Sequence, residues 1–327
     1  MSKLVTIYGG SGFVGRYIAR RLAKDGWRIR IAVRRPNEAL FTKPYGAVGQ
    51  VEPVFCNIRD DASVRMAMMG ADAVVNCVGI LNVAGKNGFD AVQADGAERI
   101  ARIAAELGVK TMVHLSAIGA DANSASAYAR SKAKGEAGVL QHFPDAMILR
   151  PSVLFGTEDG FFNKFAAMSR FTPVLPITGG GSKFQPVWVD DVAAAAVMGV
   201  EGKAKGTFEL GGPDQASLTE LMKTMLGVIN RKRAIFNMPF GLASLMASVF
   251  DGLQGATGGL FNNTLLTRDQ VKNLKKDNIV SADARGFAQL GITPMAMGAI
   301  MPGYLWRFRP HGQYEDIQAS AKNLKRS

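Results

Sequence analysis

The chain has 327 residues, of which 39 are basic and 27 acidic, with two cysteines and a 47% share of hydrophobic residues. This composition excludes wholesale disorder, and two cysteines cannot supply a disulfide framework or a cysteine-rich zinc site. The net charge of +12 is compatible with an anionic membrane, a phosphorylated ligand or an acidic protein. No zinc-finger, basic-zipper or aromatic RNA-binding pattern accompanies the charge, so we expect no nucleic-acid partner and no metal site.

The first half of the chain alternates between strand and helix patterns. Such alternation predicts βαβ units with right-handed crossovers, and thus a Rossmann-like, doubly wound α/β fold with a parallel sheet. The predicted strands are Lys3–Tyr8, Arg28–Val33, Val51–Cys56, Ala73–Cys77, Thr111–Leu115 and Met147–Leu149. The predicted helices between them are Phe13–Asp25, Ala62–Met69, Ala91–Leu107 and Ala127–His142.

After Arg150 the pattern becomes less regular. A helix is predicted over Asp190–Val200 and a strand over Thr207–Leu210, and the pair Ser217 and Glu220 matches a capping box that opens another helix. We expect a Rossmann domain at residues 1–200. Residues 201–327 are expected to form a smaller C-terminal lobe and extension, interleaved with the first domain.

A glycine-rich segment lies between the first predicted strand and the first predicted helix. Its residues are Gly9, Gly10, Ser11, Gly12, Phe13, Val14 and Gly15. In this position Gly9 permits a sharp turn, Gly12 lets the backbone approach a pyrophosphate, and Gly15 lets the helix pack closely on its strand. The helix N-terminus then favours the negative charge of the pyrophosphate. The alternative is an ordinary glycine-rich turn.

The end of the second predicted strand distinguishes NAD from NADP. An NAD site usually has an acidic residue there, whereas this chain has Arg34 and Arg35. Arginine pairs with a 2′-phosphate or stacks on adenine, so NADPH is the predicted cofactor, with Arg16 as a further contact. Asn57 and Ile58, after the third strand, are placed to border the adenine. Alternatively, the arginines only cover the edge of the sheet.

Ser116, Tyr128 and Lys132, together with the glycine loop, resemble the short-chain dehydrogenase/reductase family. The resemblance implies that Lys132 holds the nicotinamide ribose and lowers the pKa of Tyr128, that Tyr128 is the general acid or base, and that Ser116 orients the substrate oxygen. It also implies cofactor contacts from Cys77, Val78, Gly79, Tyr128, Lys132, Pro151, Ser152 and Val153.

Two positions near this motif bear on its chemistry. Where the extended family has Asn-Val-x-Gly-Thr, the chain reads Gln93-Ala94-Asp95-Gly96-Ala97, so the supporting asparagine is missing and the proton relay is in doubt. Tyr128 and Lys132 could then remain as ribose ligands only. His114 is expected to be a buried histidine with satisfied hydrogen bonds.

Later motifs resemble one atypical branch of the family, the NADPH-binding accessory subunits of respiratory complex I. The motifs are Arg150–Ala166, Gln185–Ala193, Ser131–Glu136, Leu290–Pro294 and Tyr304–Arg309. This resemblance implies a tightly held NADPH outside the electron-transfer path, and a place where the peripheral arm meets the membrane arm. It also implies contact with other complex I subunits. Because the N-terminus goes directly into a strand without a transit-peptide pattern, we expect a bacterial form, peripheral on the cytoplasmic side of the inner membrane.

The apolar run Met238–Phe250 follows the basic residues Arg231–Arg233. Helical spacing relates Leu242, Leu245, Met246, Val249 and Leu253, so the run predicts a short helix that lies in a membrane interface, in a partner groove or inside the smaller lobe. Anionic lipid is therefore a further candidate partner. The uncharged runs Ala234–Phe250 and Phe287–Trp306 contain prolines and do not match a membrane-spanning helix. The segment Arg307–Ser327 could extend along a partner.

Three functions remain open on the sequence. The first is a structural subunit of complex I that holds a non-catalytic NADPH. The second is a free NADPH-dependent reductase or epimerase, which the intact Ser116, Tyr128 and Lys132 favour. The third is a binding protein that responds to the ratio of NADPH to NADP.

Overall fold

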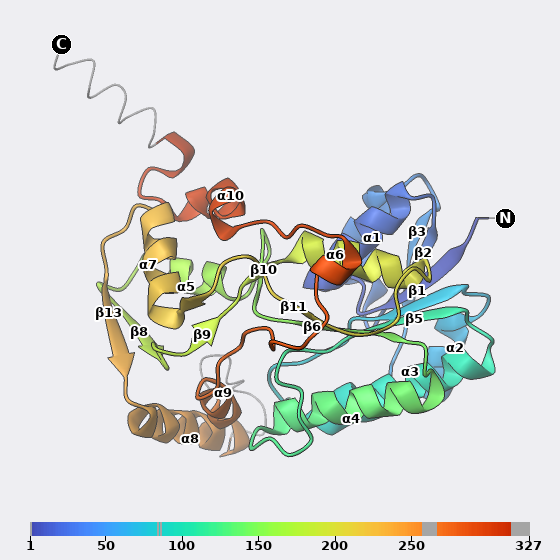
Figure 1. The fold of residues 1–327 in the computed structure, drawn as a ribbon, viewed down its shortest axis with the longest axis horizontal. Coiled ribbons are helices and arrows are strands. Elements are labelled where there is room, and N and C mark those ends of the chain that lie inside the picture. Colours follow the sequence, from blue (N-terminus) through green and yellow to red (C-terminus); the bar gives the residue numbers. More distant parts are fainter. Residues whose placement is uncertain (1, 84, 86, 257–266, 315–327) are drawn as a thin grey trace, which may run out of the picture.

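A parallel β-sheet forms the centre of the molecule. The computed structural model describes residues 2–83, 85, 87–256 and 267–314. Among these residues seven strands form one sheet in the order β11-β6-β5-β4-β1-β2-β3, and every neighbouring pair is parallel (Figure 1). The strands are β1 Leu4–Tyr8, β2 Arg28–Val33, β3 Val51–Phe55, β4 Ala73–Asn76, β5 Thr111–Leu115, β6 Met147–Pro151 and β11 Gly206–Leu210. This order confirms the predicted Rossmann-like fold.

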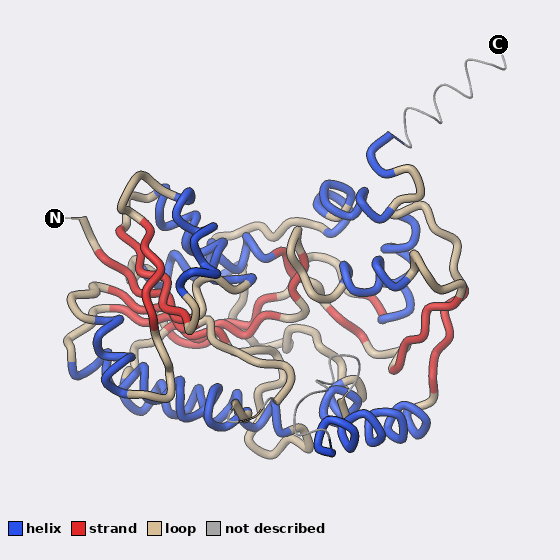
Figure 2. The backbone as a smooth tube through the Cα atoms, turned by 180° about the vertical axis from the view of Figure 1, so that it is seen from behind, coloured by secondary structure: helices blue, strands red, loops and turns tan. Residues whose placement is uncertain are grey.

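Helices cover both faces of this sheet (Figures 1 and 2). One face packs against α1 (Phe13–Lys24) and α6 (Val189–Val200), whose apolar residues join the buried strand residues in one core. The other face packs against α2 (Asp61–Met68), α3 (Asp95–Glu106) and α4 (Ala127–His142) in a second core. The near-continuous apolar central strands follow from this double coverage, whereas the edge strand β3 is partly exposed, with Phe55 63% exposed.

Two irregular helices differ from the predicted elements. A 3-10 helix, η1 (Pro36–Tyr45), follows β2 where no element was predicted. The predicted helix Ala91–Leu107 begins with a π-helical turn, η2 (Asp90–Ala94), before α3. The π turn brings the carbonyl oxygen of Gln93 against α4. A Cβ on Gly135 would lie 2.1 Å from that oxygen, so the close approach requires glycine at this position.

A smaller lobe with its own apolar core lies beside the carboxyl end of the sheet (Figure 1). Its main elements are α5 Phe162–Met168, β8 Val174–Thr178, α7 Leu218–Val228, β13 Ala234–Met238, α10 Met297–Ile300 and α11 Pro302–Leu305. The strand pairs β7 Leu154–Phe155 with β10 Val187–Trp188, and β9 Lys183–Phe184 with β12 Ala216–Ser217, connect it to the main sheet. Ser217 and Glu220 form the predicted capping box of α7.

The apolar run after the basic cluster is divided between two elements. Met238 ends β13, and α8 (Phe240–Ala256) follows after Pro239. The short helix α9 (Arg268–Asn273) packs on α8, with Ala243 and Ala247 of α8 buried against Val271. No helix in the described part of the chain is long and apolar enough to cross a membrane.

The predicted extension at Arg307–Ser327 lies only partly within the structure. Residues 315–327 and the side chain of Leu253 lie outside the described residues. Arg307 folds back on the smaller lobe, where its guanidinium donates to the carbonyl oxygen of Thr157 (3.0 Å) and to the side chain of Asn163 (2.8 Å).

Candidate functional site

The predicted cofactor residues gather at one edge of the sheet. They follow the carboxyl ends of six parallel strands: Gly9–Arg16 after β1, Arg34 and Arg35 after β2, Asn57 and Ile58 after β3, Cys77–Gly79 after β4, Ser116 after β5, and Ser152 and Val153 after β6. Pro151 is the last residue of β6. Because the strands run in the same direction, these loops meet at the edge where doubly wound folds bind their ligands.

The glycine loop leaves little room for side chains. Gly9 has φ +74°, and a Cβ added to it would lie 3.2 Å from the backbone of Cys77. A Cβ on Gly15 would lie 2.6 Å from the Gly9 carbonyl oxygen, which makes glycine necessary there too. Helix α1 begins after Gly12 with no side-chain cap and no acidic residue in its first turn. Its N-terminal N–H groups are therefore available to an anion.

The three arginines near this loop have different surroundings. Arg16 donates to the carbonyl oxygens of Ser11 and Gly12, pairs with Glu158 at 3.4 Å and stacks on Phe41. Arg35 pairs with the exposed Glu38 at 2.9 Å. Arg34 is exposed and makes no hydrogen bond or ion pair with a described residue. Of the three, Arg34 can turn toward a phosphate without breaking an existing bond.

The predicted catalytic residues lie beside the ends of β4 and β5. The Nζ atom of Lys132 donates to the carbonyl oxygen of Leu115 at 3.1 Å and lies 6.0 Å from the centre of the Tyr128 ring. Both side chains project from α4, one helical turn apart. The Oγ atom of Ser116 is buried and has no hydrogen-bond partner among the described residues. The Ser116 hydroxyl thus lacks a hydrogen-bond partner in the described structure, and it lies at the same carboxyl edge of the sheet as Tyr128 and Lys132.

Burial shifts both titrating groups of this site toward their neutral forms. Burial lowers the pKa of the Lys132 ammonium to about 8, although the charge of Glu136 opposes this shift. Burial also raises the pKa of the Tyr128 hydroxyl to about 12, so Tyr128 carries its proton at neutral pH. Tyr128 is accordingly a proton donor rather than a ready base.

His114 differs from its prediction. It is buried, and burial together with the charge of Lys132 lowers its pKa to about 3. Its Nδ1 atom lies 3.1 Å from Nδ2 of Asn76, but Nε2 has no partner. The histidine is neutral, as expected for a core residue, yet it is only half satisfied because no described polar group reaches Nε2.

Gln93 is a site residue that the sequence analysis missed. Its buried amide donates to the Ser131 hydroxyl at 2.9 Å, while no polar group in the described part of the chain reaches its Oε1 atom. A Cβ on Gly79 would lie 3.3 Å from Nζ of Lys132 and 3.5 Å from this oxygen, so both atoms face the same space beside Gly79. The chain thus has an amide side chain in the place where the family has asparagine. The presence of glutamine at position 93 was the sequence signal that could have predicted this site residue.

Asp269 is the second residue that sequence reasoning missed. This α9 carboxylate accepts hydrogen bonds from the Ser126 hydroxyl (2.6 Å) and from the backbone N–H groups of Ala127 (2.7 Å) and Tyr128 (3.1 Å). It therefore caps the helix that carries Tyr128 and Lys132, from 141 positions further along the chain. No local pattern in the sequence could have indicated this contact.

The remaining predicted contacts are of two kinds. Asn57 closes its own turn, since its Oδ1 atom accepts from the N–H of Arg59. Ser152 donates to the carbonyl and side-chain oxygens of Asn278, at 2.8 and 2.6 Å. Its hydroxyl is thus used to hold the C-terminal segment against the end of β6. Ile58, Cys77, Val78 and Val153 supply partly buried apolar walls.

The residues present fit a bound dinucleotide. The uncapped start of α1, the tight glycine loop and the space beside Gly79 form the cradle. At the other end of this cradle, Oγ of Ser116 and Oε1 of Gln93 have no hydrogen-bond partner among the described residues, and polar groups of a ligand would supply one. Among the described residues no group of acidic, histidine or cysteine side chains could hold a metal ion.

Comparisons with known proteins agree with this geometry. Residues 5–211 match the model of the family described as "NAD dependent epimerase/dehydratase family". The chain is 33% identical to NADH dehydrogenase [ubiquinone] 1 alpha subcomplex subunit 9, mitochondrial, of Arabidopsis thaliana, over 94% of this chain and 79% of that protein. It is 30% identical to a ceramide reductase of Caulobacter vibrioides, over 72% of this chain and 74% of the relative.

Solved structures show the same fold. An NADPH-dependent quinone oxidoreductase of Escherichia coli, solved in complex with NADPH, superposes with a TM-score of 0.68. The superposition covers 92% of this chain and 98% of the other, at 17% sequence identity. At this identity the likeness concerns the fold alone.

Proposed function

We propose that this chain, which belongs to the NAD dependent epimerase/dehydratase family, is an accessory subunit of respiratory complex I. The proposal starts from its place in the branch of that family that contains the alpha subcomplex subunit 9 of NADH dehydrogenase. The proposed subunit holds NADPH without turning it over and stabilises the junction of the peripheral and membrane arms, on the cytoplasmic side of a bacterial inner membrane. The observation that carries this proposal is the match to the Arabidopsis subunit over 94% of the chain.

The residues that would hold NADPH follow from the site. The start of α1 would take the pyrophosphate, Arg34 and Arg35 the 2′-phosphate, and Lys132 with Tyr128 the nicotinamide ribose. A bound reduced nicotinamide could supply a hydride, which the proposed subunit does not use. Lys132 already donates to the Leu115 carbonyl, which positions its ammonium group in advance of any ligand. This preorganisation favours tight binding whether or not chemistry follows.

The test is to purify the native assembly through a tag on this chain. Mass spectrometry should find complex I subunits with the chain, and the released nucleotide should be NADPH. A chain recovered without any complex I subunit would overturn the proposal. A tightly held NADH in place of NADPH would overturn the cofactor assignment alone.

A second candidate is an NADPH-dependent reductase that acts on a lipid-like carbonyl substrate. Two observations favour it: the buried hydroxyl of Ser116 has no hydrogen-bond partner among the described residues, and Tyr128 is protonated, which is the state that a proton donor needs for carbonyl reduction. The match to the Caulobacter ceramide reductase names one substrate class to try.

Consumption of NADPH with a long-chain ketone, lost in the double variant Tyr128→Phe with Lys132→Ala, would support this second function. Turnover that survives in the double variant would exclude Tyr128 and Lys132 as its machinery. The variant Lys24→Ala is a suitable control, because this exposed lysine lies at the far end of α1.

A further inference from the structure

Helix α8 buries its small residues and exposes its large apolar ones, which is the reverse of the usual arrangement. Its small residues Ala243 and Ala247 are buried against α9. Its large apolar residues face away from the protein and are 38% to 63% exposed: Leu242, Leu245, Met246 and Val249. These four positions are spaced i, i+3, i+4 and i+7, so they form one stripe along the helix. A helix that only supports a core would bury this stripe.

The apolar surface continues from α8 along the edge of the smaller lobe. Strand β13 leads directly into α8 and pairs with β8, and the two strands form one margin of the molecule (Figure 1). Phe236 on β13 is 52% exposed, and Val174 on β8 is also exposed. Phe171, just before β8, is 82% exposed. We call these three residues and the four of the α8 stripe the lobe edge.

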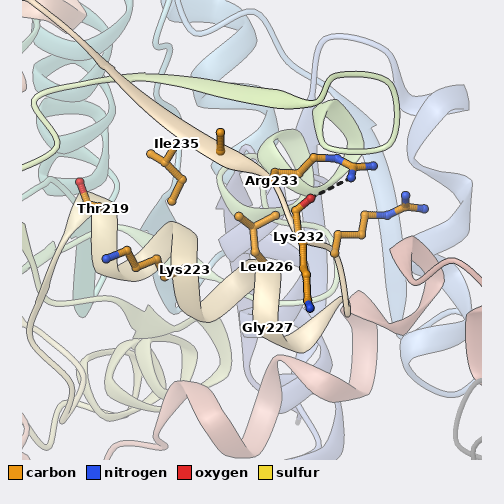
Figure 3. A pocket seen from close by; sticks show the side chains of 9 residues that line it. Thr219, Lys223, Leu226, Gly227, Lys232, Arg233 and Ile235 are labelled. Carbon is orange, nitrogen blue, oxygen red and sulfur yellow. Dashed lines mark hydrogen bonds between the residues drawn. The ribbon is translucent and has the colours of Figure 1, made fainter.

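Two groups of basic residues border the lobe edge. An open hollow of about 750 Å³ lies between α7 and the start of β13, and its lining includes Lys223, Arg231, Lys232 and Arg233 (Figure 3). No acidic residue belongs to that lining. Arg233 is held by the carbonyl oxygens of Ser169 and Lys232, which fixes part of the basic wall.

Alongside α8, helix α9 and the turn after it carry exposed Arg268, Lys272, Lys275 and Lys276. The guanidinium of Arg268 donates to the Ser248 hydroxyl, and Nζ of Lys275 lies 5.6 Å from the centre of the Phe240 ring at the start of α8. Between the two basic regions, the segment from Ala234 to Phe250 has no charged residue. The lobe edge is therefore an apolar strip bordered by basic residues.

We propose that the lobe edge is a membrane-binding face, in which α8 lies flat in the interface of an anionic bilayer and the basic hollow takes a lipid phosphate headgroup. An interfacial helix requires an exposed apolar stripe with cationic neighbours, and it does not require the length of a spanning helix. The pattern of charge favours the bilayer over an acidic protein, because the α8 stripe itself carries no charged residue while cations lie close beside it, with Arg170 over the Phe171 ring and Lys275 over the Phe240 ring.

This inference deepens the proposed function, since it names the surface through which a peripheral chain would reach a membrane. It does not depend on the cofactor or on complex I. A chain that binds vesicles but no complex I subunit would overturn the proposed function and leave the membrane-binding face standing.

The test uses the purified full chain and sedimentation with vesicles of phosphatidylcholine, with or without phosphatidylglycerol. We expect binding to the anionic vesicles that weakens as salt is added. The double variant Leu245→Glu with Val249→Glu should bind about tenfold less, because glutamate resists transfer into the interface. The control, Val48→Glu with Met66→Glu, adds the same charge at exposed apolar positions away from the lobe edge and should bind nearly as the parent does.

The basic hollow is tested separately. Lys223→Glu with Lys232→Glu should remove most of the preference for anionic vesicles, whereas Lys24→Glu with Arg28→Glu, at exposed positions elsewhere, should leave it largely intact. Unchanged thermal midpoints confirm that each variant is folded.

Equal binding by the parent and the Leu245→Glu, Val249→Glu variant would overturn the proposal, as would equal losses in the test and control pairs. Two results together would assign the lobe edge to a protein partner instead. In that case the parent chain would bind neither kind of vesicle, and the Leu245→Glu, Val249→Glu variant would be released from a native protein assembly.

Discussion

The carboxyl edge of the main sheet and the lobe edge are built in opposite ways. At the sheet edge, Gly9, Gly15 and Gly79 remove side chains so that backbone and polar atoms can approach a small ligand. At the lobe edge, α8 buries alanines and turns leucine, methionine and valine outward. The first arrangement lets the atoms of a ligand come close to the backbone, and the second leaves a stripe of large apolar side chains exposed.

Helix α9 connects the two regions. Val271 packs on α8, while Asp269, two residues earlier, caps the helix that carries Tyr128 and Lys132. A surface for attachment and a site for a cofactor are thus joined by a single turn of helix, although they are distant in the sequence.

The largest effect is expected from a substitution that adds a side chain to the glycine loop at the sheet edge. Gly15→Val should abolish nucleotide binding and lower the free energy of unfolding by about 3 kcal/mol, because its Cβ would meet the Gly9 carbonyl oxygen at 2.6 Å. Gly227→Ala, in the smaller lobe, has open space around it and should be neutral or slightly stabilising. Calorimetric titration with NADPH measures the affinity of both variants, and urea unfolding measures their stability. Retained NADPH affinity in Gly15→Val would refute the proposed cradle.

The buried ammonium of Lys132 predicts a pH-dependent stability. Its pKa is about 8 in the folded chain and near 10.5 when unfolded, so burying the charge costs stability below pH 8. The cost is relieved as pH rises from 8 to about 10.5, because the unfolded state then binds more protons than the folded state. Without cofactor, Lys132→Met should therefore gain up to about 3 kcal/mol relative to the parent at pH 7, and much less at pH 9.5.

Urea unfolding at the two pH values measures this difference. Tyr128→Phe is the control, since the tyrosine stays protonated across this range. A gain that does not change with pH would show that Lys132 is not desolvated as described.

The 2′-phosphate assignment predicts a smaller, selective effect. Arg34→Ala with Arg35→Ala should weaken NADPH about thirtyfold and NADH little, because arginine makes charge-assisted bonds with the phosphate that NADH lacks. Lys24→Ala with Arg28→Ala removes the same charge elsewhere and should leave both affinities near those of the parent. Equal losses for NADPH and NADH in the first pair would refute the assignment.

The smallest expected effect tests the link between the two regions. Asp269→Asn should lower the free energy of unfolding by about 1 kcal/mol, because an amide replaces a charged cap on the α4 N-terminus. It should also weaken NADPH binding by a few fold through displacement of Tyr128. Asp283→Asn, exposed and away from any helix start, is the control. Loss of stability with unchanged NADPH affinity would limit Asp269 to a structural role.

Much of the fold was predictable from the sequence, because its signals are local. Alternating strand and helix patterns located the first six strands of the main sheet to within one or two residues, and the predicted helix Ala127–His142 coincides with α4. The π turn at Asp90–Ala94 was not predictable, since it depends on the contact between the Gln93 carbonyl and Gly135 of another helix. The 3-10 helix Pro36–Tyr45 likewise lacks a strong apolar period.

The sequence by itself determined the glycine loop, the arginines after β2 and the helical spacing of Tyr128 and Lys132. Each of these depends on residues a few positions apart, whose relative placement the backbone geometry of a strand, turn or helix already imposes.

Only the tertiary structure decided the rest: the ion pair of Arg16 with Glu158, the cap that Asp269 places on α4, the amide of Gln93 beside Lys132, and the outward face of α8. The uncharged run Ala234–Phe250 has apolar residues on every side, so periodicity could not say which face would be buried. That choice was made by packing, in which Ala243 and Ala247 lie against Val271 of α9 and the larger side chains stay exposed.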